Sequence, residues 1–298
     1  MRLTIQNLSK TYPNGVQALQ GIDLEIGNGM FGLLGPNGAG KSSLMRTIAT
    51  LQEADTGTIT LDNINVLQQK DEVRKILGYL PQEFGVYPKV SAENMLDHLA
   101  VLKGVSNKNE RRMLVKALLE KTNLYDVRKK NLGGYSGGMK QRFGIAQALI
   151  ADPKLIIVDE PTAGLDPAER NRFHNLLAEL GEEKVVILST HIVDDVKELC
   201  TDMAIINKGV VLLKGNPLKA IEAIEGKVWK KSIEKGQLPD YEQEYNVISE
   251  RMIAGRPVIH VLSNDKPEAS FEAIPADLED VYFSKIFGNA VNTNPVND

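Results

Sequence analysis

The feature that most constrains the fold is a glycine-rich segment at residues 35–42, Gly-Pro-Asn-Gly-Ala-Gly-Lys-Ser. It fits G-x-x-x-x-G-K-[ST], the pattern of a phosphate-binding loop. The apolar run Met30–Leu34 before it predicts a buried strand, and a helix is expected from Lys41. This strand–loop–helix context disfavours a turn that matches by accident. Glycines let backbone N–H groups approach a polyphosphate, and the helix directs its positive end at the anion. The segment therefore predicts an α/β fold with a polyphosphate site.

The residues of this loop have predicted roles. Lys41 is expected to reach the β- and γ-phosphates, and the Ser42 hydroxyl to bind Mg²⁺. The residues expected around the phosphates are Gly35, Pro36, Asn37, Gly38, Ala39, Gly40, Lys41, Ser42 and Ser43.

A second apolar run, Leu155–Val158, ends in two carboxylates, Asp159 and Glu160. Strand ends in open α/β sheets deliver polar groups to one crevice. Asp159 is expected to hold the metal through water, and Glu160 to polarise an attacking water as general base. A hydrophobic run that ends in Asp-Glu is weak evidence alone, but it gains weight after a phosphate loop.

Length, charge and composition bound the remaining possibilities. A chain of 298 residues suits one large domain and one small one. The net charge of -4 argues against nucleic acid as the main ligand. Cys200 is the one cysteine, so no intramolecular disulfide can form and a reducing compartment is expected. The N-terminus lacks the apolar core of a signal peptide, and no apolar run approaches the roughly 20 residues of a membrane span. Any membrane-spanning part is therefore expected in a separate chain.

Changes in the pattern of apolar and polar residues along the chain predict its domains. Residues 1–215 are expected to form the nucleotide-binding domain, with a helical subdomain at about 88–150. After Asn216-Pro217 the pattern changes to short strand-like runs and a closing helix, which predicts a small accessory domain at 216–288. The polar tail at 289–298 is expected to be disordered.

Over roughly Leu3–Leu213, with its elements in the family's order, the chain resembles the nucleotide-binding subunits of ABC transporters. The resemblance implies that Tyr12 stacks on adenine. It implies that Gln82, in the sequence Tyr-Leu-Pro-Gln, touches Mg²⁺ and couples to the membrane partner. The residues that match further family motifs are Ser136, Gly137 and Gly138 of the signature loop, Asp166 of the D-loop at 163–166, and the switch histidine His191 after Ser-Thr.

Each of these matches has a plainer reading. Tyr12 could be a strand-end aromatic, Gln82 a surface amide, His191 a core histidine, and the signature segment a flexible loop. Their joint occurrence in the family's order argues against chance.

The resemblance implies a fold and a mechanism. The fold is the ABC cassette: a RecA-like core sheet, an antiparallel β subdomain and an inserted helical subdomain, here with a small α+β C-terminal domain. The expected activity is ATP hydrolysis with Mg²⁺, where Lys41, Gln82, Glu160 and His191 act in catalysis. Two ATP molecules are expected between two subunits, identical or different, arranged head to tail. The implied partner is a separate integral membrane permease, which places the chain in the cytoplasm on the inner face of the membrane.

Two positions depart from the commonest signature, Tyr135 where the family usually has Leu and Met139 where it usually has Gln. Met139 resembles the variant of the drug-, antibiotic- and ion-export branch, and the C-terminal segment Ala276–Tyr282 resembles the tail of those ATPases. Ser136 and Gly138 are retained, so activity is expected to survive. The small domain itself could be a stability or dimer-bracing module, or a regulatory site.

Three rival functions remain open. A GTPase usually needs an N-K-x-D loop, and the nearest match, residues 207–210, lacks the Asp. A soluble ABC ATPase of the ribosome or of DNA repair usually carries two cassettes or a long coiled coil, and neither is seen here. A regulatory module that no longer hydrolyses ATP is expected to lose Glu160 or His191, and both are present.

Overall fold

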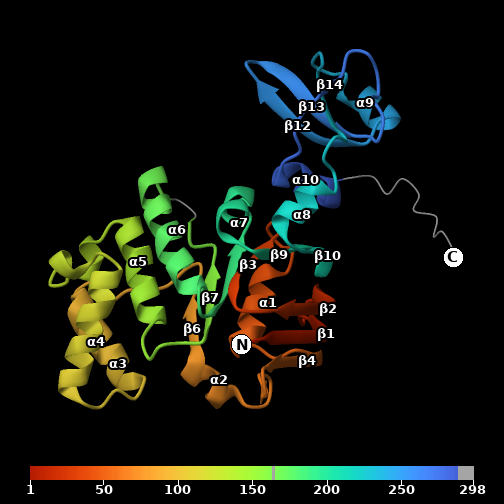
Figure 1. The fold of residues 1–298 in the computed structure, drawn as a ribbon. Coiled ribbons are helices and arrows are strands. Elements are labelled where there is room, and N and C mark those ends of the chain that lie inside the picture. Colours follow the sequence, from red (N-terminus) through yellow and green to blue (C-terminus); the bar gives the residue numbers. More distant parts are fainter. Residues whose placement is uncertain (163–164, 288–298) are drawn as a thin grey trace. The chain divides into compact units, whose positions relative to one another are not determined.

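A computed structural model describes residues 1–162 and 165–287 (Figure 1). The chain divides into two compact units, Met1–Lys214 and the part that starts at Gly215. The boundary predicted from sequence lies at 215/216, and the tail predicted to be disordered lies outside the described residues.

The central element of the first unit is a six-stranded sheet with the order β10-β9-β3-β8-β7-β6. Strands β3, β6, β7, β8 and β9 pair in parallel, so their carboxyl ends meet at one edge. The phosphate loop follows β3, Asp159 ends β7 and Thr190 ends β8 at that edge. The strands are β3 (Gly29–Leu34), β6 (Leu77–Leu80), β7 (Leu155–Asp159), β8 (Val185–Thr190), β9 (Asp202–Asn207) and β10 (Val210–Gly215).

A second, four-stranded antiparallel sheet has the order β2-β1-β4-β5. Its strands are β1 (Leu3–Thr11), β2 (Gln17–Ile26), β4 (Thr56–Leu61) and β5 (Ile64–Asn65). Along β2, Ile22, Leu24 and Ile26 are buried while the residues between them are exposed, as the alternating pattern predicts.

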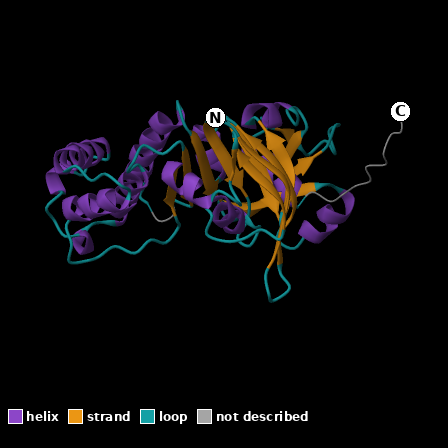
Figure 2. Cartoon of the chain, turned by 90° about the horizontal axis from the view of Figure 1, so that it is seen from below, coloured by secondary structure: helices purple, strands orange, loops and turns teal. Residues whose placement is uncertain are grey.

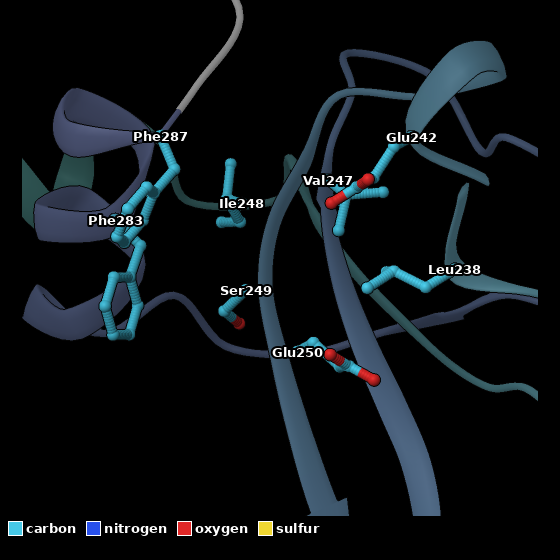
Figure 3. A pocket seen from close by; sticks show the side chains of 8 residues that line it. All are labelled: Leu238, Glu242, Val247, Ile248, Ser249, Glu250, Phe283 and Phe287. Atoms are coloured by element: carbon cyan, nitrogen blue, oxygen red, sulfur yellow. The ribbon is translucent and has the colours of Figure 1, made fainter. Parts of the chain in front are cut away.

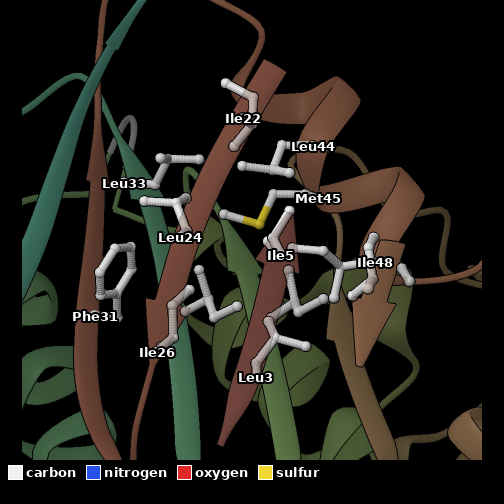
Figure 4. Packing of buried hydrophobic residues seen from close by; sticks show 14 of the residues in the cluster. Leu3, Ile5, Ile22, Leu24, Ile26, Phe31, Leu33, Leu44, Met45 and Ile48 are labelled. Carbon is white, nitrogen blue, oxygen red and sulfur yellow. The ribbon is translucent and has the colours of Figure 1, made fainter. Parts of the chain in front are cut away.

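Helix α1 (Lys41–Ile48) joins the two sheets through one apolar core. In Figure 4, Leu44, Met45 and Ile48 of α1 point toward strand residues that include Ile5 and Leu24. This packing fixes the helix that follows the phosphate loop. Helix α1 ends at Ile48, and Leu51 beyond it is 62% exposed, so Leu51 is not part of this core.

The inserted helical subdomain contains α3 (Ala92–Leu102), α4 (Lys108–Lys121) and α5 (Gly137–Ala148), which Figure 2 shows in purple beside the sheets. Ser91 caps α3 by accepting a hydrogen bond from the Asn94 N–H, and Asn107 caps α4 in the same way. Two short 3₁₀ turns, Tyr125–Val127 and Leu132–Gly134, connect α4 to α5. The helices that flank the parallel sheet are α2 (Lys70–Ile76), α6 (Pro167–Gly181) and α7 (Val193–Leu199).

Residues 215–287 of the second unit form a four-stranded sheet of order β12-β13-β11-β14 and three short helices. Strand β12 forms one edge of this sheet, and a groove of about 450 Å³ runs along it. Figure 3 shows Phe283 and Phe287 on one side of β12, and Leu238 and Glu242 on the other. The elements are α8 (Pro217–Glu222), β11 (Val228–Ser232), α9 (Leu238–Glu244), β12 (Val247–Ile253), β13 (Arg256–Leu262), β14 (Glu272–Ala273) and α10 (Leu278–Ile286).

In the described part of the chain, no helix combines the length and the apolar character that crossing a bilayer requires.

Candidate functional site

The phosphate loop runs from the end of β3 to the start of α1, and two of its glycines are required by their surroundings. A Cβ atom at Gly35 would lie 2.3 Å from the carbonyl oxygen of Ile206. Gly40 has φ +108, and a Cβ there would lie 2.4 Å from the carbonyl oxygen of Ala18. Only glycine fits at both positions. At these two positions the loop backbone therefore lies closer to neighbouring backbone of the same chain than a residue with a side chain would permit.

Lys41 carries a positive charge inside this loop. Its side chain is 4% exposed, and its Nζ donates hydrogen bonds to the carbonyl oxygens of Gly35 at 2.7 Å and Pro36 at 3.2 Å. The same Nζ lies 3.2 Å from Glu160 Oε1. A buried charge needs such partners, because it has lost its water. The ammonium is thus held where the loop and the end of β7 meet.

Glu160 and His191 come together from the ends of β7 and β8. Glu160 Oε2 lies 2.8 Å from His191 Nδ1, and the Glu160 side chain is 7% exposed. The Glu160 backbone has φ +47, a left-handed conformation that is unusual for a residue with a side chain. Its N–H donates to the Ser189 carbonyl oxygen at 2.9 Å. Strain of this kind is held by surrounding structure and clusters at functional sites.

Asp159 is buried beside them, and its Oδ1 accepts a hydrogen bond from Ser189 Oγ at 2.8 Å. Burial raises the pKa of the nearby Tyr79 phenol, and the Asp159 charge raises it further. The hydroxyl, carboxylate and amide oxygens of Ser42, Asp159 and Gln82 are the hard donors that Mg²⁺ takes. Among residues 1–162 and 165–287, no group of three or more His, Cys, Asp or Glu is placed to hold a metal. The oxygen donors of Ser42, Asp159 and Gln82 suit Mg²⁺ because this ion commonly binds one or two carboxylates together with substrate phosphates.

The structure brings most of the predicted residues into one pocket of about 330 Å³. The Tyr12 hydroxyl lies 3.0 Å from Ser43 Oγ and donates to Gln52 Oε1 at 3.0 Å. Sequence reasoning missed Gln52, which no motif marks, and the lining residues Val16 and Ala18. The residues that line the pocket are Tyr12, Val16, Ala18, Pro36, Asn37, Gly38, Ala39, Gly40, Lys41, Ser42, Ser43, Gln82 and Glu160.

The predicted signature loop and Asp166 do not line this pocket. Ser136 caps α5, where its Oγ accepts from the Met139 N–H at 3.2 Å, and Asp166 caps α6, where its Oδ1 accepts from the Glu169 N–H at 2.9 Å. Glu169 also packs on Gly138, where a Cβ would lie 2.6 Å from Glu169 Oε2. Gly138 and Asp166 thus both contact Glu169, and we call these three residues, together with Ser136 two positions before Gly138, the signature cluster. Residues 163 and 164 of the predicted D-loop lie outside the described residues.

Comparison with known proteins identifies the family. Residues 19–163 match the family described as ABC transporter. The ABC transporter ATP-binding protein NatA of Bacillus subtilis is 36% identical over 203 residues, which cover 67% of this chain and 82% of NatA. The linearmycin resistance ATP-binding protein LnrL of the same organism is 34% identical over 215 residues, 72% of this chain and 68% of LnrL. The probable multidrug ABC transporter ATP-binding protein YbhF of Escherichia coli is 29% identical over 311 residues, 99% of this chain and 54% of YbhF.

Solved structures support the same assignment. A dimeric post-hydrolysis structure of an ATP-binding cassette bound to ADP and Pi has a TM-score of 0.66 and 27% identity, covering 72% of this chain and 98% of that one. The structure of cbiO1 from Clostridium perfringens, part of the ABC transporter complex cbiONQ, has a TM-score of 0.67 and 29% identity, covering 74% of this chain and 90% of that one. The predicted fold class is thereby confirmed. The chain belongs to the ATP-binding subunits of ABC transporters, which are ATPases that use ATP with Mg²⁺.

Proposed function

We propose that this chain powers a separate membrane permease, and that two subunits, arranged head to tail, complete each ATP site. One observation carries the proposal. The signature-cluster residues Ser136, Gly138 and Asp166 do not line the pocket formed by the phosphate loop. Two-fold pairing brings the signature cluster of one subunit to the phosphate loop of the other. The dimeric cassette with ADP and Pi supports this arrangement.

On this proposal, different residues of the site bind different parts of ATP. Tyr12 stacks on adenine, while the N–H groups of residues 35–40 and the Lys41 ammonium bind the phosphates. Ser42, Asp159 and Gln82 would hold Mg²⁺, which would neutralise charge on the phosphates when bound. Lys41 now pairs with Glu160 at 3.2 Å, so an arriving phosphate competes with Glu160 for this cation. Phosphate binding thus frees the Glu160 carboxylate for catalysis.

Hydrolysis then uses the pair of residues at the ends of β7 and β8. Glu160 accepts a proton as water attacks the γ-phosphorus, where a P–O bond forms as the bond to the ADP oxygen breaks. His191, 2.8 Å from Glu160 Oε2, orients this carboxylate and contacts the γ-phosphate. Loss of the γ-phosphate removes the bridge between the subunits, so the dimer opens. The permease converts opening and closing into transport.

An apolar groove in the first unit is the docking place we propose for a cytoplasmic helix of the permease. This groove, of about 340 Å³, lies between the core and the helical subdomain, and Leu77 and Tyr79 of β6 line it just before Gln82. Leu51 and Leu102 on its rim are 62% and 69% exposed, more than a core role explains. Burial there lowers the pKa of Lys103. An amphipathic helix matches these properties.

Export is the direction we propose, with the chain on the cytoplasmic face of the membrane. The names of YbhF and LnrL refer to multidrug transport and to linearmycin resistance. Met139 and the C-terminal segment 276–282 resemble the same branch. The cargo is determined by the permease.

The test is a pull-down from membranes of the source cell with tagged Glu160→Gln, in the presence of ATP and Mg²⁺. We expect a polytopic membrane protein to co-purify with ATP and to be lost when ATP is omitted. Recovery of ribosomes or DNA, with no membrane protein, contradicts the permease proposal and favours a soluble ABC machine.

A further inference from the structure

Outside the residues that line the pocket, one buried carboxylate contacts four polar side chains from three other segments of the first unit. Asp195 of α7 is 0% exposed. Its Oδ2 accepts hydrogen bonds from Thr162 Oγ1 at 2.6 Å and from Thr190 Oγ1 at 3.2 Å. Its Oδ1 lies 2.9 Å from Arg170 Nε and 2.9 Å from His174 Nε2, both on α6. A carboxylate this rich in partners is costly to bury and is held in one orientation.

Two of these partners adjoin the residues proposed for hydrolysis. Thr162 lies two residues after Glu160, and Thr190 immediately precedes His191. The Thr190 hydroxyl also accepts from the Ile192 N–H at 2.9 Å, which fixes the backbone on both sides of His191. One oxygen of Asp195 therefore holds the loop after β7 and the loop after β8 at the same time.

His174 adds a positive charge to this cluster. Its Nε2 faces Asp195, and its Nδ1 lies 2.9 Å from Glu198 Oε2. Carboxylates only accept hydrogen bonds, so both ring nitrogens carry protons. Burial opposes this charge, but the bonds and charges of Asp195 and Glu198 outweigh it and raise the pKa of His174. The other groups that face the cluster are Arg170, with Nη2 2.8 Å from Asp195, and the buried Cys200 thiol.

We propose that Asp195 is a positioning residue for ATP hydrolysis, which sets the loops that carry Glu160 and His191 relative to each other and to α6 and α7. The inference rests on the roles proposed for Glu160 and His191. A cluster needed for stability alone gains little from burying charges, since well-packed apolar side chains often serve as well. Here the charges meet at the two loops of the site.

Asp195→Asn tests the proposal, because the amide keeps the shape but replaces one accepting oxygen with a donor. We expect kcat for ATP to fall about tenfold to a hundredfold, as for a small misplacement of reacting groups, while KM stays within about threefold. Amide hydrogen exchange should rise in residues 158–162 and 187–192 and stay unchanged in β1 and β4. Asp194→Asn, on the same helix but exposed, is the control and should behave as wild type.

The exchange measurement separates this inference from the proposed function, because it does not depend on turnover. If Glu160→Gln retains full turnover while Asp195→Asn still loosens both loops, the base role is wrong and the positioning role stands. Unchanged kcat and unchanged exchange in both loops overturn the inference.

Should Asp195→Asn fail to fold, Thr190→Val removes the hydrogen bonds of this hydroxyl with Asp195 and with the Ile192 N–H, and leaves the charges intact. A fall in kcat at constant KM, with faster exchange in 187–192, then supports the inference. Wild-type kcat and exchange contradict it.

Discussion

At the scale of single residues, the site depends on the interactions of three polar side chains, Lys41, Glu160 and His191. Lys41 lies against Glu160, and Glu160 against His191, at 3.2 and 2.8 Å. Both Lys41 and Glu160 are almost completely buried. Each ion is therefore sensitive to loss of its partner. Two substitutions separate phosphate binding from catalysis.

Glu160→Gln removes the proposed base and keeps the shape of the side chain. We expect kcat to fall at least about a hundredfold, in the range expected for a positioned base, while ATP still binds. Glu179→Gln on the exposed face of α6 is the control. Steady-state phosphate release and equilibrium ATP binding measure the two effects. Near-normal turnover removes Glu160 from the base role.

Lys41→Ala removes the cation that faces the phosphates. We expect ATP affinity to fall about tenfold or more, since a charged hydrogen bond to an anion contributes roughly 1.5 to 3 kcal/mol. Titration with a fluorescent ATP analogue measures this. Undiminished affinity and turnover would show that Lys41 does not bind phosphate.

Several of these residues were predictable and others were not. A glycine loop followed by Lys-Ser, and an apolar run that ends in Asp-Glu, require particular chemistry at fixed spacing, so sequence alone pointed to 35–43 and to Asp159 and Glu160. Asp195 and His174 carry no such pattern. On α7 and α6 they look like ordinary helical polar residues, and only tertiary packing makes them a buried pair.

At the scale of elements, two features lead to testable predictions. They are the contact between α6 and α7 and the groove beside α3. The apolar run Met30–Leu34 predicted a buried strand and the loop after it predicted a helix from Lys41, and the structure has both, as β3 and α1. The short helix α9 (Leu238–Glu244) was not predicted, because its polar sequence shows no helical periodicity. The exposure of Leu51 and Leu102 was not predictable either, because apolar periodicity does not distinguish a core face from an exposed docking face.

The α6–α7 contact should depend on pH. The pKa of His174 is raised above its ordinary value of 6.5, so its stabilisation is complete below pH 6.5 and is lost as pH rises through the raised value. The pKa of Asp195 is lowered below its ordinary 3.8, so its stabilisation is lost only in acid below that value.

We therefore expect the free energy of unfolding of wild type to exceed that of His174→Gln by about 1 to 3 kcal/mol at pH 6, and the difference to shrink at alkaline pH. Urea unfolding at a series of pH values measures it. A difference that grows with pH contradicts a charged His174.

The groove beside α3 gives a prediction about the partner. Leu102→Glu places a charge on its apolar rim. We expect intrinsic ATPase activity within about twofold of wild type and a loss of about tenfold or more in permease recovery, because burying an unpaired charge is costly. Met113→Glu, on the exposed face of α4, is the control. Full recovery of the permease with Leu102→Glu rules out this docking site.

At the scale of the whole molecule, the proposed dimer would combine two groups of residues in one ATP site. The phosphate pocket contains Lys41 and Glu160, and the signature cluster contains Ser136 and Asp166. The order of motifs along the chain predicted the family, and the comparisons confirm it. Which surfaces face each other between subunits was not predictable from composition or periodicity, because it depends on a second chain.

The most direct test of this account is the mass of Glu160→Gln in solution, measured by sedimentation with and without ATP and Mg²⁺. We predict a monomer without nucleotide and about twice that mass with ATP, and a return to monomer when Ser136→Arg is added to block the signature cluster. A Glu160→Gln protein that binds ATP but remains a monomer at saturating nucleotide contradicts the shared site.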